Sequence, residues 1–92
     1  MIARRIVVSG RVQGVGYRYA MTDAARSAGV SGWVRNRRDG TVEALVQGDE
    51  EQVERMLAWC RRGPPGARVT AIAIDELNID PAIEGFAPRP TD

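Results

Sequence analysis

Hydrophobic and polar positions follow two different periods in the first part of the chain. Residues 4–9 form a short run rich in β-branched side chains, which predicts a strand. Residues 17–28 carry apolar or small side chains at helical spacing and Gly29 follows as a C-terminal stop, so a helix is predicted here. Residues 30–37 then alternate between two faces, which predicts a second strand.

The middle of the chain predicts a hairpin and a second helix. Asp39 and Gly40 form a strong hairpin signal, and residues 41–47 alternate as a third strand, which should pair antiparallel with the second. Apolar positions then recur at helical spacing after a capping signal formed by Asp49 and Gln52. The second helix is predicted to run from this point to the Gly-Pro segment that ends it.

The last part of the chain predicts a fourth strand over residues 68–77 and a short edge piece over residues 82–86. Prolines oppose regular pairing beyond that point, so we expect one domain over residues 1–87 and a loose Pro-rich C-terminal tail over residues 88–92. The order of elements is that of a ferredoxin-like βαββαβ sandwich, an α+β fold in which two helices pack on one face of an antiparallel sheet.

Composition limits the chemistry available to this fold. A chain of 92 residues holds one small domain, all 13 of its basic residues are Arg, and it contains no His. Cys60 is the only Cys. These absences exclude a His general base, a Ser-His or Cys-His couple, a Schiff-base Lys and a zinc site built from several Cys or His. An enzyme built on this chain has to use Arg, carboxylates, amides and backbone groups.

Charge is distributed unevenly along the chain, although the formal net charge is only +1. Residues 1–48 carry eight Arg against three acids, whereas residues 49–92 carry five Arg against nine acids. We therefore expect an anion-binding site in the first half. A single thiol cannot form an internal disulfide, and no apolar run suits a signal peptide or a membrane span, so a cytoplasmic protein without membrane contact is expected.

A glycine-rich segment between the first strand and the first helix is the best candidate for the anion site. Residues 10–16 contain three Gly. Such a loop can direct several backbone N–H groups at one point, and the helix start adds partial positive charge. Arg18 follows in the first helical turn, where its planar guanidinium matches phosphate oxygens. For the loop alone, an ordinary strand-to-helix turn with a solvated Arg explains the pattern equally well.

Polar residues around the predicted hairpin have ordinary structural explanations when each is taken alone. Asn36 stands just before the turn, where Asn is common. Asp39 and Glu43 do not suggest a catalytic carboxylate pair, because a hairpin turn and a solvent-facing strand position account for them.

Three motifs in this order resemble the acylphosphatase family, over a stretch from about Val7 to Ala73. They are Gly10-Arg11-Val12-Gln13-Gly14-Val15-Gly16-Tyr17-Arg18, Gly29-Val30-Ser31-Gly32-Trp33-Val34-Arg35-Asn36 and Asp39-Gly40-Thr41-Val42. The resemblance implies that Arg18 and Asn36 are the catalytic pair and that Asn36 orients the attacking water. It also implies that phosphate binds Arg18 and the backbone amides of Val12, Gln13, Gly14, Val15, Gly16, Tyr17 and Arg18. After Phe86 the chain departs from the family pattern, which leaves the length of the last strand open.

The reaction implied by the resemblance is hydrolysis of the carboxyl-phosphate bond of an acyl phosphate by direct attack of water. We expect a monomer that acts on a small-molecule acyl phosphate, with no metal, no cofactor and no nucleic-acid partner. The alternative is a non-catalytic ferredoxin-like module that binds RNA or a small ligand. Against RNA binding, the chain has only one Phe and two Tyr, and no pair of aromatic residues alternates on a strand.

Overall fold

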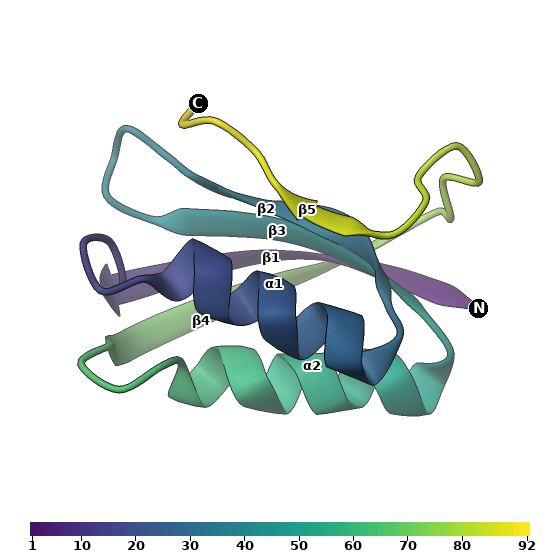
Figure 1. Ribbon diagram of the computed structural model, residues 1–92, viewed down its shortest axis with the longest axis horizontal. Helices are drawn as coiled ribbons and strands as arrows, with labels where there is room; N and C mark the ends of the chain where they lie inside the picture. The colour runs from purple at the N-terminus through teal and green to yellow at the C-terminus, as the bar shows by residue number, and fades with distance from the viewer.

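The computed structural model describes all residues from Met1 to Asp92 and contains one sheet covered on one face by two helices (Figure 1). The elements along the chain are β1 Ile2–Arg11, α1 Tyr17–Ala28, β2 Ser31–Asn36, β3 Val42–Gly48, α2 Glu50–Arg62, β4 Arg68–Leu77 and β5 Phe86–Pro88. The first six follow the predicted order, so the ferredoxin-like α+β fold is confirmed. Neither helix is long and apolar enough to cross a membrane.

The sheet has the strand order β4-β1-β3-β2-β5. β1 pairs antiparallel with β3 and β4, and β2 pairs antiparallel with β3 across the predicted hairpin. β5 pairs parallel with β2, so the sheet is mixed and not wholly antiparallel as expected. The last residues of β4 pair with the start of β1, and the first residues of β2 pair with the end of β3. Because the start of β1 pairs with the end of β3, β4 ends at the same end of the strands where β2 begins. A chain that leaves β4 and crosses there to the other edge of the sheet therefore runs parallel to β2.

The C-terminal residues continue along β2 and do not form the loose tail that the prolines suggest. β5 begins at the residue where the predicted edge piece ends. Beyond β5, the amide of Arg89 donates to the Val34 carbonyl at 2.8 Å, and the amide of Asp92 donates to the Asn36 carbonyl at 3.0 Å. Successive N–H groups of a strand point to opposite edges. Because the Arg89 amide points to β2, the nitrogens of Pro88 and Pro90 face the open edge of the sheet, where no donor is needed.

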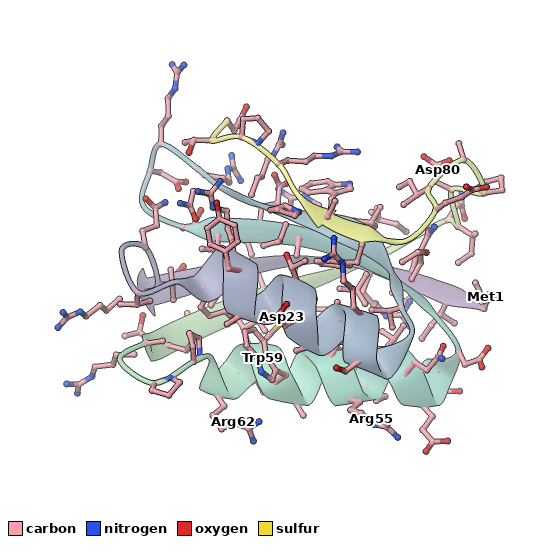
Figure 2. The ribbon with its side chains drawn as sticks, viewed as in Figure 1. Met1, Asp23, Arg55, Trp59, Arg62 and Asp80 are labelled. Carbon is pink, nitrogen blue, oxygen red and sulfur yellow. The ribbon has the colours of Figure 1, made fainter.

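The core lies between the sheet and the helices. Its largest fully buried side chains are Tyr17, Ile6, Met21, Met56, Val8, Val12, Val34, Val42, Val46, Val53 and Cys60. Tyr17 joins the start of α1 to the end of α2, because its hydroxyl donates to the Cys60 carbonyl at 2.7 Å. The Tyr17 ring also packs edge-on against the Trp59 ring, with 5.3 Å between the ring centroids. Trp59 is labelled in Figure 2, where it lies between the two helices. Burial raises the pKa of the Cys60 thiol to about 12, so this thiol stays protonated.

The uncovered face of the sheet carries a buried carboxylate. The Glu43 side chain on β3 is only 5% exposed and lies between Arg5 and Arg35, with a nitrogen of each 2.6 Å from a carboxylate oxygen. Burial alone would raise the pKa of Glu43, but hydrogen bonds from Arg35 and Arg5 outweigh it and lower the pKa. The expectation that Glu43 faces solvent is therefore wrong, and two arginines of the basic half neutralise an internal acid.

Candidate active site

The glycine loop predicted from the sequence connects β1 to α1. Residues 12–16 lie outside both elements, and Gly14 and Gly16 have left-handed φ angles of 75° and 77°. A Cβ atom at either position would meet nothing within 4 Å. The two glycines are thus required by the backbone conformation and not by crowding, and the space beside them is open to a ligand.

The backbone amides of this loop have no acceptor among the backbone carbonyls. No amide from Gln13 to Arg18 donates a backbone hydrogen bond, and the helical series starts with Ala20, which donates to the Gly16 carbonyl at 3.0 Å. Gly16 is the N-cap and supplies no side-chain cap, and the first turn of α1 contains no acid. The loop therefore offers free N–H groups at the positive end of a helix dipole, an arrangement that favours a bound anion.

Arg18 extends from the first turn of α1 toward the C-terminal segment. Its Nη1 atom donates to the Arg89 carbonyl at 2.9 Å, and its guanidinium carbon lies 5.9 Å from the centre of the Tyr19 ring. Arg18 takes part in none of the salt bridges of the structure. Its positive charge is therefore not neutralised by a carboxylate and is available to an anion at the loop.

Asn36 is the last residue of β2, and its side chain is partly exposed. Its carbonyl accepts the amide of Asp92, so Arg18 and Asn36 both contact the C-terminal segment 89–92. The glycine loop and the β2–β3 hairpin lie at the same end of the molecule (Figure 1). The fold thus places the loop, Arg18 and Asn36 at one end, although they come from three different elements.

One side chain links the glycine loop directly to the hairpin. Gln13 Nε2 donates to the Arg37 carbonyl at 2.7 Å and to the Thr41 carbonyl at 2.9 Å. Sequence reasoning assigned a role only to the backbone of Gln13. Its side chain was missed because the partners lie 24 and 28 residues away, and no local pattern in the sequence connects them.

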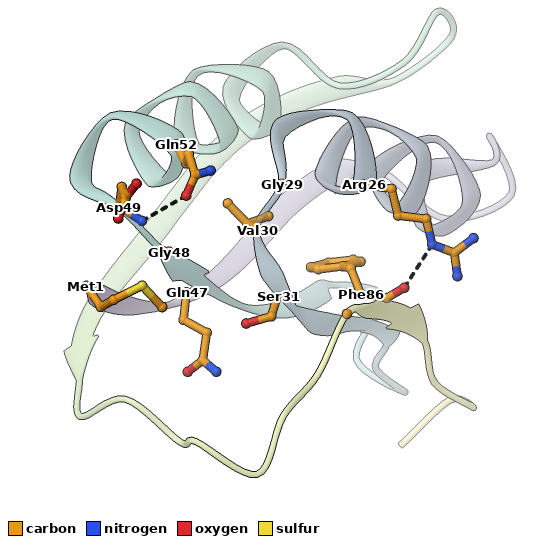
Figure 3. Close-up of a pocket in the computed structure, with 11 residues that line it drawn as sticks. Met1, Arg26, Gly29, Val30, Ser31, Gln47, Gly48, Asp49, Gln52 and Phe86 are labelled. Carbon is orange, nitrogen blue, oxygen red and sulfur yellow. Dashed lines mark hydrogen bonds between the residues drawn. The ribbon is translucent and has the colours of Figure 1, made fainter.

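Two depressions lie at opposite ends of the molecule. One lies beside Asn36 and is lined by Arg37, Arg38, Asp39 and Asp92. The other, shown in Figure 3, lies where α1 ends and α2 begins, far from the glycine loop. No group of three or more acidic or thiol side chains is placed to hold a metal ion.

Comparison with known proteins identifies the class to which this fold and site belong. The sequence model of the acylphosphatase family matches residues 4–88. The chain is 54% identical to the acylphosphatase of Acidiphilium cryptum over 91 residues, 99% of both chains. It is also 54% identical to an acylphosphatase 2 of Ralstonia nicotianae, over 94% of this chain and 90% of that protein. The crystal structure of acylphosphatase from Bacillus subtilis matches with a TM-score of 0.92 and 37% identity, over 97% of this chain and 99% of that one.

A small ferredoxin-like domain with these relatives is a hydrolase of acid anhydrides. The chain belongs to the acylphosphatase family, and acylphosphatase is a hydrolase, EC 3.6.1.7, that acts on small acyl phosphates. The family and the enzyme class expected from the sequence are both confirmed.

Proposed function

We propose that the chain hydrolyses the carboxyl-phosphate bond of small acyl phosphates at the end of the molecule that carries the glycine loop, Arg18 and Asn36. The observation that supports this site best is the set of amides from Gln13 to Arg18 without a backbone acceptor. Backbone N–H groups need a partner, and here only solvent or a ligand can supply it. Membership of the acylphosphatase family supports an acyl phosphate as the ligand of this loop.

In the proposed complex, the phosphoryl oxygens accept hydrogen bonds from the backbone amides of residues 12–18 and from the Arg18 guanidinium. Arg18 exchanges its neutral acceptor, the Arg89 carbonyl, for an anionic oxygen, which makes a stronger hydrogen bond. Charge spread over the phosphoryl oxygens in the transition state meets donors that are already in place. The loop thus lowers the barrier mainly by electrostatic stabilisation.

Asn36 is proposed to hold the attacking water in line with the bond that breaks. The water oxygen bonds to phosphorus while the bond from phosphorus to the acyl oxygen breaks, and the carboxylate leaves with the electron pair. A carboxylate whose parent acid has a pKa of about 4 leaves without protonation, so no general acid is required. The proton of the water passes to a phosphate oxygen in the product, which suits a chain that contains no His.

The proposed reaction requires no metal and no cofactor, because the donors of the loop and Arg18 meet the charge on phosphate. We further propose that the chain works as a monomer in the cytoplasm and binds no nucleic acid. The site residues come from one chain, and the single Cys is buried and protonated, in keeping with a protein that forms no disulfide.

The test is hydrolysis of acetyl or benzoyl phosphate by purified protein in the presence of EDTA, compared with an alkyl phosphate monoester. Acyl phosphate should be hydrolysed and the monoester should not, because an alkoxide leaves poorly without an acid. Asn36→Ala should lower kcat about 10²-fold, since misplaced water reacts slowly, while binding of inorganic phosphate is retained.

Asn78→Ala is the matched control, because Asn78 is exposed just beyond the end of β4. It should leave kcat unchanged. Full activity in Asn36→Ala, or activity that EDTA abolishes, would contradict the proposed mechanism.

A further inference from the structure

The side-chain NH2 group of Gln13 joins two parts of the proposed site. An amide NH2 group has two hydrogens, and those of Gln13 are directed to the carbonyls of Arg37 and Thr41 at 2.7 and 2.9 Å. These carbonyls belong to the base of the β2–β3 hairpin, where the amide of Arg37 also donates to the Thr41 carbonyl at 2.9 Å. Arg37 directly follows Asn36 in the chain.

No backbone hydrogen bonds join the glycine loop to the β2–β3 hairpin. The pairing of β1 with β3 ends at Val8 and Val42, and from Ser9 to Arg11 β1 pairs only with β4. No backbone hydrogen bond connects residues 12–16 with the hairpin. The hydrogen bonds of the Gln13 side chain are therefore the direct hydrogen-bonded link between the glycine loop and the residue that follows Asn36.

We infer that Gln13 is a positioning residue for acyl phosphate hydrolysis, because its side chain sets the distance between the phosphate-binding amides and Asn36. This inference rests on the proposed function. The Gln13 backbone amide belongs to the loop, while its side chain holds the hairpin. Through this link, a phosphate bound by the loop and a water held by Asn36 keep a fixed separation, to which in-line attack is sensitive.

The chemistry of the link allows few substitutes. Glu at this position presents only acceptors to two carbonyl oxygens, Met is of similar length but donates nothing, and Asn is one methylene shorter. Gln13→Met therefore removes the link while keeping the volume of the side chain, and Gln13→Asn keeps the amide but shortens its reach.

The chain contains a matched control at its other end. Gln47 makes a comparable link, since its Nε2 donates to the Asp80 carbonyl at 2.8 Å and its Oε1 accepts the Asp80 amide at 3.1 Å. Gln47→Met removes a side-chain link of the same kind far from the glycine loop. It should lower the melting temperature and leave kcat and KM unchanged.

The experiment compares Gln13→Met in the wild-type and Asn36→Ala backgrounds with acetyl phosphate as substrate. We expect Gln13→Met to lower kcat about tenfold or more in the wild-type background, with less than a threefold change in the Kd of inorganic phosphate. In the Asn36→Ala background the same substitution should change kcat less than twofold, because the residue that it positions is absent.

Equal losses in both backgrounds, or a loss confined to phosphate binding, would overturn the inference and assign Gln13 to loop structure alone. If Gln13→Met does not fold, Gln13→Asn is measured in the same cycle and judged by the same outcomes.

An NMR readout separates this inference from the proposed function. The side-chain NH2 resonances of Asn36 should shift in free Gln13→Met and remain unchanged in Gln47→Met. Unchanged resonances in Gln13→Met would overturn the positioning role whatever substrate the enzyme uses.

Discussion

The N-termini of α1 and α2 lie at opposite ends of the helix layer, and their first backbone amides have different partners. The N-cap of α1 is Gly16, which is left-handed, has no side chain to cap the helix, and is followed by a first turn without acids. The N-cap of α2 is Asp49, which forms a capping box with Gln52, and Glu50 and Glu51 follow in the first turn. The Asp49 amide donates to Gln52 Oε1 at 2.9 Å, as drawn in Figure 3.

The difference shows how the residues around a helix N-cap leave its backbone amides either bonded within the protein or free for the proposed ligand. Both helices begin with unpaired backbone N–H groups at the positive end of a helix dipole, so the residues around the N-cap decide which groups bond to these amides. At α2, the protein's own side chains bond to them and stabilise the helix. At α1, a cap worth about 1 kcal/mol is absent, and the amides are left to solvent or to an anion.

The largest effect is expected from removing the charge beside the uncapped terminus. Arg18→Ala should lower kcat/KM for acetyl phosphate by about 10²- to 10³-fold, because Arg18 is proposed to bind phosphate in both the ground state and the transition state. Steady-state kinetics and the Kd of inorganic phosphate measure the two contributions. Arg18→Lys should recover only part of the rate, since an ammonium lacks the planar fork.

The control for this prediction is an arginine on the other helix. Arg55 projects from the outer side of α2, away from the sheet, and its side chain is 64% exposed (Figure 2). Arg55→Ala also removes one positive charge, so it tests whether net charge alone governs activity. Equal losses in the two variants would mean that long-range attraction, and not the position of Arg18, controls the rate.

A smaller but more specific effect is expected from making the start of α1 resemble that of α2. Gly16→Asp places a carboxylate beside the free amides, where it competes with phosphate and repels it. We expect inorganic phosphate to bind about tenfold more weakly, a loss of about 1.4 kcal/mol, with a matching fall in kcat/KM. Isothermal titration with phosphate measures the change.

Gly16→Asn separates charge from conformation, because Asn tolerates the left-handed region as well as Asp does and carries no charge. A Cβ at Gly16 meets no neighbour, so both variants should fold. If Gly16→Asn weakens phosphate binding as much as Gly16→Asp, the backbone conformation of the loop matters and its electrostatics do not.

Local signals predicted the uncapped and the capped terminus alike, because glycines, capping residues and helical periodicity act over a few residues. They also placed Arg18 in the first turn of α1 and Asn36 at the end of β2. Features that depend on distant residues were not predicted. Glu43 lies between Arg35, eight residues away, and Arg5, which reaches it from β1, 38 residues away.

The pairing of the C-terminal segment also depends on distant residues and was not predicted from local signals. Its prolines locally oppose pairing, yet the edge of β2 accepts a strand whose missing donors face outward. Which edge is open, and in which direction a strand can enter it, is a property of the whole sheet. The contact of Arg18 with the Arg89 carbonyl follows from this pairing and could not be read from the motif that contains Arg18.

The smallest expected effect is a loss of stability without loss of activity, produced by uncapping α2. Gln52→Ala removes the acceptor of the Asp49 amide and should lower the free energy of unfolding by about 1 kcal/mol, since one hydrogen bond of a capping box is lost. For a chain of this size, that loss shifts the melting temperature by roughly 4–8 °C. Gln52→Glu should keep most of the stability because a carboxylate also accepts the bond. Both variants should retain the kcat/KM of the wild type, because the start of α2 lies at the far end of the helix layer from the glycine loop. A fall in kcat/KM for Gln52→Ala, measured well below its melting temperature, would mean that the two helix ends are coupled and that the division between a stabilising and a binding terminus is wrong.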